Sequence, residues 1–346
     1  MAVRSYLKVM LAVALCGMAI GHGAPVAAAP AEQAPSADMT RLLDYLRGQN
    51  TTGFLVIQDG HVLVERAWPA PTDDRTFADF VYERTGDGAL LEDVASQQKS
   101  FVSVLVAVAI DKGLIRVEKP VSDYIGKGWS KASPEQEAKI RVIDVLTMSS
   151  GLNEKFGYEA PAGTLFFYNT PVYAVTKRIV TAAANQPLEA ITRDWLTVPL
   201  GMKDTAWRKR PAALASIGND TGLVTSPRDI ARFGLMILKG GVADTGKRIV
   251  SESSFKAMFA RSATNPAYGR LWWLNGSAYT MRALAGRKDG PLIAAAPADL
   301  VAALGAFDRR LYVVPGRKLV VVRTGATARD KDFDEQLWLR LMKVIR

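Results

Sequence analysis

Hydrophobic and polar residues follow two different periods in the first third of the chain. Apolar residues recur at helical spacing behind Asp38, a favoured N-cap residue, which predicts a helix over 38–47. Residues 52–66 hold two β-rich runs around an Asp-Gly pair, which predicts a hairpin. Residues 102–110 are apolar on nearly every side, so we expect a helix that is buried all round and is ended by Gly113.

The rest of the chain has a mostly helical pattern that gives way to strands. Residues 96–260 are mostly helical in pattern, and 143–152 predict a helix that ends at a glycine. Three later segments have strand character: 269–274, 292–303 and 311–323. An amphipathic helix is expected over 334–345. Strands from both chain ends with helices between them indicate an α/β (α+β) fold, in which one antiparallel sheet is flanked by helices and a helical domain is inserted.

The first 28 residues have the layout of a secretory signal peptide. A basic lead over 1–8 precedes an uncharged apolar run over 9–20, and a Val-Ala-Ala tripeptide before residue 29 supplies small residues for cleavage. The run is shorter than the ~20 residues that span a bilayer. We therefore predict a periplasmic or secreted protein with no stable membrane insertion after signal removal. Residues 29–37, rich in Ala and Pro, predict a flexible leader.

Length and composition beyond the leader suit a globular domain. The chain has 346 residues, of which 49% are hydrophobic and 23% charged. We expect a sheet part over 38–95 and 265–346 and a helical part over 96–264. Loss of the signal removes Arg4 and Lys8 and no acid, so the formal net charge falls from +10 to +8. Basic residues are scattered rather than interleaved with aromatic ones, which argues against a nucleic-acid partner.

The supply of cysteine and histidine excludes several kinds of catalytic site. The single cysteine, Cys16, lies in the predicted signal, so the mature chain has no thiol for a disulfide, a nucleophile or a metal. His22 lies there too, and we interpret His61, beside the predicted hairpin turn, as solvated. The sequence has no Gly-x-Ser-x-Gly elbow, no His/Cys cluster and no glycine-rich phosphate loop. We therefore predict no Ser-His-Asp triad, no metal and no cofactor.

Lysine remains as a base for an activated serine. Ser96 and Lys99 stand three residues apart at the head of the apolar run, so they share a helix face. A lysine base must be neutral near pH 7, which requires its pKa to fall by roughly 3 units, or about 4 to 5 kcal/mol. Burial and a helix N-terminus both disfavour the ammonium. The alternative is an N-cap serine with a lysine that reaches solvent.

Other segments extend this pair into a family resemblance. Residues 163–170, Gly-Thr-Leu-Phe-Phe-Tyr-Asn-Thr, follow a Thr-Met-Ser-Ser-Gly-Leu segment. With the Ser-x-x-Lys pair, they resemble class C β-lactamases, penicillin-binding carboxypeptidases and their esterase and 6-aminohexanoate-dimer hydrolase relatives. The resemblance covers most of the mature chain, and it implies a β-lactamase-like serine hydrolase domain over 38–346. A second Ser-x-x-Lys, Ser253 to Lys256, lies in an amphipathic segment that gives its lysine a solvated face.

The resemblance implies roles for particular residues. Ser96 would be the nucleophile, Lys99 its base and Tyr168 a second acid/base. The backbone N–H groups of Ser96 and Ala306 would bind the oxyanion. Thr170 stands where the family motif has asparagine, and the neighbouring Asn169 is the alternative for that contact.

The family's third motif places a cation two residues before a glycine. The matching segment here is Ala303-Leu304-Gly305, which keeps the glycine and lacks the cation. Arg309 or Arg310 could bind a substrate carboxylate instead, or could lie at a solvated strand edge. The missing cation favours a small-molecule ester or short amide as substrate. The alternatives are a β-lactamase or D,D-carboxypeptidase, and a catalytically silent binding protein on the same fold.

Overall fold

The computed structural model describes residues 36–72, 74–282 and 286–345. Its largest sheet has six antiparallel strands in the order β2-β1-β12-β11-β10-β7, so strands from both ends of the chain lie side by side. Their bounds are β1 Thr51–Gln58, β2 His61–Ala67, β7 Trp273–Leu274, β10 Val301–Gly305, β11 Arg309–Val314 and β12 Leu319–Gly325. The sheet built from both termini and the hairpin around Asp59-Gly60 are as the sequence predicts.

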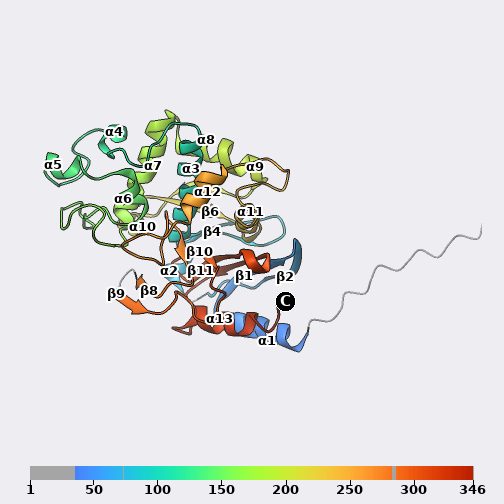
Figure 1. Cartoon of the computed structure of the whole chain (residues 1–346). Coiled ribbons are helices and arrows are strands. Elements are labelled where there is room, and N and C mark those ends of the chain that lie inside the picture. The colour runs from blue at the N-terminus through green and yellow to red at the C-terminus, as the bar shows by residue number, and fades with distance from the viewer. Residues whose placement is uncertain (1–35, 73, 283–285, 346) are drawn as a thin grey trace, which may run out of the picture. The chain divides into compact units, whose positions relative to one another are not determined.

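Helices cover both faces of this sheet. Helices α1 (Ala37–Gly48) and α13 (Phe333–Leu341) lie together on one face, and α11 (Pro227–Leu238) packs against β1, β11 and β12 on the other (Figure 1). The three central strands β1, β11 and β12 are buried along their whole length, which matches their near-continuous apolar sequences. The edge strand β2 is mostly exposed.

Helix α3 (Gln98–Asp111) runs through the middle of the helical region. Every residue from Gln98 to Ala109 is buried, because α7 (Thr170–Ala184), α12 (Glu252–Met258) and the end of β10 pack around it. The Phe101 ring stacks on Phe233 of α11 at 3.9 Å between centroids. The sequence prediction of a helix buried on all sides is therefore confirmed, and its first turn carries Lys99.

A second, four-stranded sheet has the order β3-β4-β6-β5 and was not apparent in the sequence. Its strands are β3 Val81–Arg84, β4 Leu90–Asp93, β5 Ala206–Lys209 and β6 Thr221–Thr225. It joins two strands from before α3 to two strands from the mostly helical middle. The division into a sheet part and a helical part stays a prediction. A two-stranded ribbon, β8 (Tyr279–Arg282) and β9 (Gly286–Asp289), lies apart from both sheets.

The remaining helices are short and connect the main elements. They are α2 Arg75–Ala78, α4 Ser122–Ile125, α5 Pro134–Glu137, α6 Val142–Leu146, α8 Leu188–Thr192, α9 Val198–Leu200, α10 Ala212–Ala215, the π-helical turn η2 Arg193–Thr197, and the 3-10 turns η1 Ala95–Gln97 and η3 Pro315–Arg317.

Several elements differ from the prediction. Of the expected strand over 269–274, only Trp273–Leu274 forms a strand. The expected strand over 292–303 is wrong before residue 301, since 292–300 is irregular, and the expected helix over 143–152 stops at Leu146. Residues 311–323 form the hairpin of β11 and β12, whose chain turns through η3. No helix among the described residues is long and apolar enough to cross a membrane. The predicted signal peptide and most of the leader lie outside the described residues.

Candidate active site

Ser96 lies in a sharp turn between the second sheet and the buried helix. The one-turn helix η1 follows β4 directly and leads into α3. Ala95, the residue before the serine, has a φ of +50°, a left-handed conformation that costs an alanine about 1 to 2 kcal/mol. The Ala95 N–H donates to Asp93 Oδ1 at 2.8 Å, which holds the residue there. Strain of this kind persists only where neighbouring contacts enforce it.

A buried ion pair fixes the aspartate that holds this turn. Arg210 donates to Asp93 through two nitrogens, Nε to Oδ2 at 2.7 Å and Nη2 to Oδ1 at 2.9 Å, and both side chains are buried. Gly222 on β6 leaves room for the pair, because a Cβ at that position would lie 1.9 Å from Asp93 Oδ2. The turn that carries Ser96 is thus anchored through a two-pronged contact to Arg210, the residue after β5.

Lys99 lies one turn along α3 with its amine against the serine. Its Nζ is 2.9 Å from Ser96 Oγ and 3.2 Å from Thr170 Oγ1, and the side chain is only 2% exposed. The rings of Tyr168 and Tyr173 flank Nζ at 4.9 and 4.7 Å. Burial holds the pKa of Lys99 well below its ordinary value, and the positive charges of Arg210 and Lys177 lower it further.

Tyr168 closes the other side of the serine within an aromatic cluster. Its ring stacks on Trp273 at 5.7 Å and meets the edge of Tyr268 at 6.2 Å. Burial raises the pKa of Tyr168 to about 12, although hydrogen bonding with the side chains of Ser96 and Trp273 offsets part of the rise. The phenol is therefore protonated at neutral pH.

The side chains of Asn169 and Thr170 have different contacts: Asn169 caps α7, and Thr170 contacts the Lys99 amine. The Asn169 side chain caps α7, since Oδ1 accepts from the Val172 N–H at 3.1 Å and Nδ2 donates to the Leu152 carbonyl at 2.8 Å. Both polar ends of this buried amide are thus engaged away from Lys99. Thr170, the first residue of α7, is the residue that reaches the lysine amine.

The end of β10 lies against the nucleophile turn. A Cβ on Gly305 would lie 2.3 Å from the Val94 carbonyl oxygen and 3.4 Å from the Gln97 nitrogen, so only glycine permits this approach. Ala306 follows in the exposed turn between β10 and β11. The structure thereby brings Gly305 against the turn that carries Ser96, although the two are more than 200 residues apart in sequence.

A family model described as Beta-lactamase matches residues 40–343, almost the whole described chain. The chain belongs to the beta-lactamase family. The serine hydrolase class and the fold class inferred from the motifs are confirmed with it.

Individual relatives of the family are distant. An uncharacterized protein of Alkalihalophilus pseudofirmus is 27% identical over 256 residues, which are 66% of this chain and 72% of the relative. Penicillin-binding protein 4 of Amycolatopsis lactamdurans is 25% identical over 209 residues, which are 47% of this chain and 55% of the relative. A solved structure from Bacteroides dorei superposes with a TM-score of 0.67 at 14% identity, and the match covers 88% of this chain and 97% of the other. That structural likeness shows the shared fold alone.

The two arginines suggested as replacements for the family's cation are structural. Arg309 is fully buried, donates to Glu92 at 3.1 Å and lies among the rings of Phe77, Phe80 and Phe307 at 5.0 to 5.4 Å. Arg310 is held by Asp308 and Asp334. The interpretation of a solvated strand edge is therefore wrong, and the structure brings neither guanidinium to the cleft.

A pocket of about 580 Å³ opens beside Tyr168 and Thr170. It is lined by Glu154, Lys155, Tyr168, Thr170, Pro171, Ser216, Ile217 and Gly218. Apolar side chains and backbone dominate its inner wall, and one lysine and one glutamate stand in the 153–161 loop. A small ester or amide fits such a volume.

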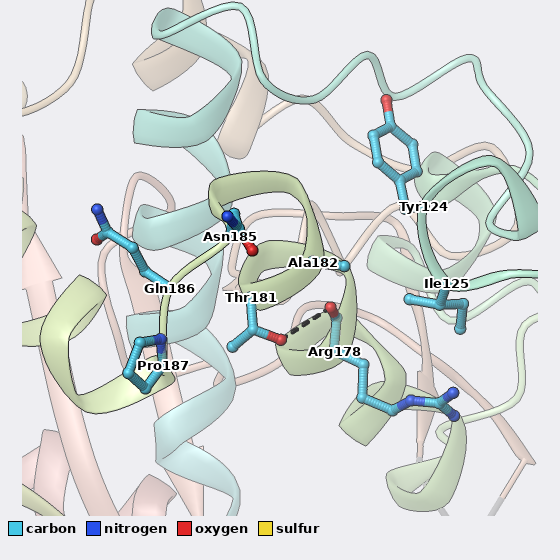
Figure 2. Close-up of a pocket in the computed structure, with 8 residues that line it drawn as sticks. All are labelled: Tyr124, Ile125, Arg178, Thr181, Ala182, Asn185, Gln186 and Pro187. Carbon is cyan, nitrogen blue, oxygen red and sulfur yellow. Dashed lines mark hydrogen bonds between the residues drawn. The ribbon is translucent and has the colours of Figure 1, made fainter.

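A second pocket, of about 640 Å³, lies at the far end of α7 (Figure 2). Thr181 lines it and is eleven residues from Thr170, so it lies about 16 Å away along the helix. The only hydrogen bond drawn there runs from Thr181 Oγ1 to the Arg178 carbonyl, within the helix itself. Its lining includes no nucleophile paired with a base, so we do not assign the reaction to it.

The predicted solvent exposure of His61 and of the lysine of the second Ser-x-x-Lys pair is confirmed. His61 is exposed at the start of β2, and Ser253 and Lys256 are exposed on α12. Within the described ranges, no group of three His, Cys, Asp or Glu side chains could hold a metal ion.

Sequence reasoning missed Asp93, Arg210 and Tyr173. The pairing of Asp93 with Arg210 spans 117 residues, and no local pattern signals it.

Replacing Gly305 by alanine tests the contact between β10 and the nucleophile turn. The new methyl group must push Val94 away, so we expect the rate of hydrolysis of an activated ester to fall by roughly 10²- to 10³-fold, as when one oxyanion donor is misplaced. The matched control is Gly86→Ala, where no atom lies within 4 Å of the new Cβ. Unchanged activity in Gly305→Ala, with the control also unchanged, would contradict the assigned contact.

Proposed function

We propose that the protein hydrolyses an ester or amide through an acyl-enzyme on Ser96. The observation that carries this proposal is the 2.9 Å separation between Lys99 Nζ and Ser96 Oγ, at a place where burial disfavours the ammonium. A neutral amine at that distance can take the hydroxyl proton as the oxygen attacks a carbonyl. The reaction needs no histidine, in keeping with the chain's composition.

The opposite pKa shifts of Lys99 and Tyr168 suit them to different roles, Lys99 as the base and Tyr168 as the acid. Lys99 has a lowered pKa and Tyr168 has a raised one, and these opposite shifts favour an amine beside a phenol as the resting pair. The amine is suited to accept a proton from Ser96, and the phenol is suited to donate one to the leaving group. Return of the proton from the Lys99 ammonium to the tyrosinate restores the amine and the phenol before water attacks the acyl-enzyme.

Backbone groups would stabilise the tetrahedral intermediate. We assign the oxyanion site to the N–H groups of Ser96 and Ala306, because the Gly305 contact places the end of β10 against the nucleophile turn. Such donors are worth about 3 kcal/mol each. The loss of the family's cation leaves this role intact, since it depends on the main chain.

The substrate side of the cleft favours an uncharged ester or short amide. Ala303, which stands at the cation position, is fully buried, and the nearby Arg309 and Arg310 are engaged by carboxylates of the protein. A β-lactam or D,D-peptide substrate is the second candidate, supported by the similarity to a penicillin-binding protein and by Lys155 at the pocket. A silent binding protein is disfavoured by the close Ser96 and Lys99 contact.

Export belongs to the same proposal. Residues 1–28 supply the signal, and the mature enzyme would act on small molecules in the periplasm or outside the cell. N-terminal sequencing of the exported protein locates the cleavage.

An active-site fluorophosphonate tests the nucleophile. We expect it to label the wild type and not Ser96→Ala, because only a serine beside a neutral amine is nucleophilic enough. The matched control is Ser253→Ala, which removes the serine of the second, exposed Ser-x-x-Lys and should label like the wild type. Equal labelling of Ser96→Ala and wild type, or labelling of neither protein, would refute the assignment.

Leaving-group dependence tests the role of Tyr168. In Tyr168→Phe we expect alkyl ester hydrolysis to fall by 10²- to 10⁴-fold, because an alkoxide needs a proton in order to leave. Hydrolysis of p-nitrophenyl esters should fall much less, because nitrophenolate leaves without one. Tyr279→Phe, on the separate β8–β9 ribbon, is the control. If both kinds of ester lose activity by the same factor, the phenol is not the acid for the leaving group.

A substrate panel tests the preference for uncharged substrates. We expect kcat/KM for short p-nitrophenyl esters to exceed kcat/KM for nitrocefin and for D-Ala-D-Ala peptides, because both of the latter carry a carboxylate that Ala303 cannot bind. Faster turnover of nitrocefin would overturn the preference and favour the β-lactamase candidate.

A further inference from the structure

A second buried lysine lies on α7, behind the catalytic cluster. Lys177 is 7% exposed, and its Nζ donates to Asn219 Oδ1 at 2.5 Å and to the Thr221 carbonyl at 3.1 Å. The ring of Trp207 lies 5.2 Å from Nζ. Among the described residues, Lys177 forms no ion pair. A buried ammonium without a carboxylate is costly, so its presence calls for an explanation.

Helix α7 aligns this lysine with the residues that surround Lys99. Thr170, Tyr173 and Lys177 are spaced at i, i+3 and i+7, so they lie along one stripe of the helix. Thr170 contacts the Lys99 amine and the Tyr173 ring flanks it. The Tyr173 hydroxyl also donates to Gln98 Oε1 at 3.4 Å, which ties α7 to the first turn of α3.

The β5–β6 hairpin holds Lys177 beside a second cation. Asn219 accepts from Lys177 through its side chain and from Arg210 Nη1 through its carbonyl at 3.1 Å. Asp93 matches the charge of Arg210, whereas no direct partner matches that of Lys177. Lys177 is therefore held by neutral hydrogen-bond acceptors rather than by an ion pair, in a dry environment where charges act over longer distances than in water.

We propose that Lys177 is a positioning residue that acts through space on Lys99. Its ammonium lies on the buried side of α7 that also faces Lys99, and its positive charge favours the amine form of Lys99. The proposal rests on the proposed function, because it assumes that Lys99 is the base for Ser96. Tyr168 and Tyr173 face Lys99 directly, and both are neutral phenols in this range because burial raises their pKa values.

The charged groups around Lys99 and Lys177 determine in which direction the pKa of each lysine shifts. Arg210 and Lys177 both lower the pKa of Lys99, after the larger contribution of burial. The pKa of Lys177 itself falls to about 8, through burial and Arg210, while Asp220, Asp93 and Glu189 act against the fall. Lys177 therefore carries its charge below about pH 8 and loses it above, so its influence on Lys99 is present at neutral pH.

The experiment is the pH profile of kcat/KM for a p-nitrophenyl ester in Lys177→Met. Removal of the ammonium should raise the pKa of Lys99, so the acid limb of the profile should move to higher pH by about 0.5 to 1 unit. At a fixed pH on the acid limb, kcat/KM should fall about 3- to 10-fold, and activity at the alkaline plateau should fall less.

Two further variants separate charge from structure. Lys177→Arg keeps the charge and should leave the acid limb in place. Asn219→Asp keeps the lysine and adds a carboxylate beside it, so it should move the limb in the same direction as Lys177→Met. If Lys177 only holds the structure together, all three variants should lower the plateau value of kcat/KM and leave the pH of the acid limb unchanged. That result would overturn the proposal.

Failure of the proposed function would look different. If the wild type neither hydrolyses esters nor reacts with the fluorophosphonate at any pH, the Ser96 assignment fails first. If the wild type is active and the limb stays in place in both Lys177→Met and Asn219→Asp, then only the role of Lys177 is refuted.

Discussion

The burial of one amine is the constraint on which the rest of the site depends. Lys99 occupies the first turn of a helix that is enclosed by α7, α12 and the end of β10, so its ammonium has little access to water. Transfer of such an ion into a protein interior costs several kcal/mol, which is comparable with the roughly 4 to 5 kcal/mol needed to make a lysine neutral near pH 7. The apolar sequence of α3 therefore does more than fill the core. It creates the environment in which, under the proposed mechanism, a lysine takes the role of a catalytic histidine.

The elements around that amine reinforce one another. The strained Ala95 turn aims Ser96 at Lys99, and the Asp93–Arg210 pair holds the turn in place. The same arginine adds positive charge near Lys99, so one ion pair serves both geometry and electrostatics. Gly222 and Gly305 allow close approach on two sides of the turn, from β6 and from β10. The four-stranded sheet thus supports the turn that carries Ser96, and the end of β10 in the six-stranded sheet packs against the other side of that turn.

The sequence revealed features that depend on local pattern and concealed those that depend on distant partners. The apolar run of α3, the Asp-Gly hairpin and the Ser-x-x-Lys spacing are local, and the structure has all three. The second sheet is built from strands of four or five residues, and its two halves join through β4 and β6, which pair across more than 100 residues. Arg309 looked like a surface residue because its partner Glu92 is 217 residues away. Residues 292–300 are apolar and still form no strand, because the Asn275 side chain binds the backbone of Ile293, Ala296 and Pro297.

The charge state of Lys99 is the central claim, and NMR can observe it directly. Protein with ¹³C-labelled lysine Cε, titrated from neutral to alkaline pH, gives one curve for each lysine, and Lys99→Met identifies the signal of residue 99. The account predicts that this signal titrates well below those of the exposed lysines, so that the amine form is already present while they remain charged. A Lys99 signal that titrates together with the exposed lysines, near their ordinary pKa of about 10.4, would contradict it.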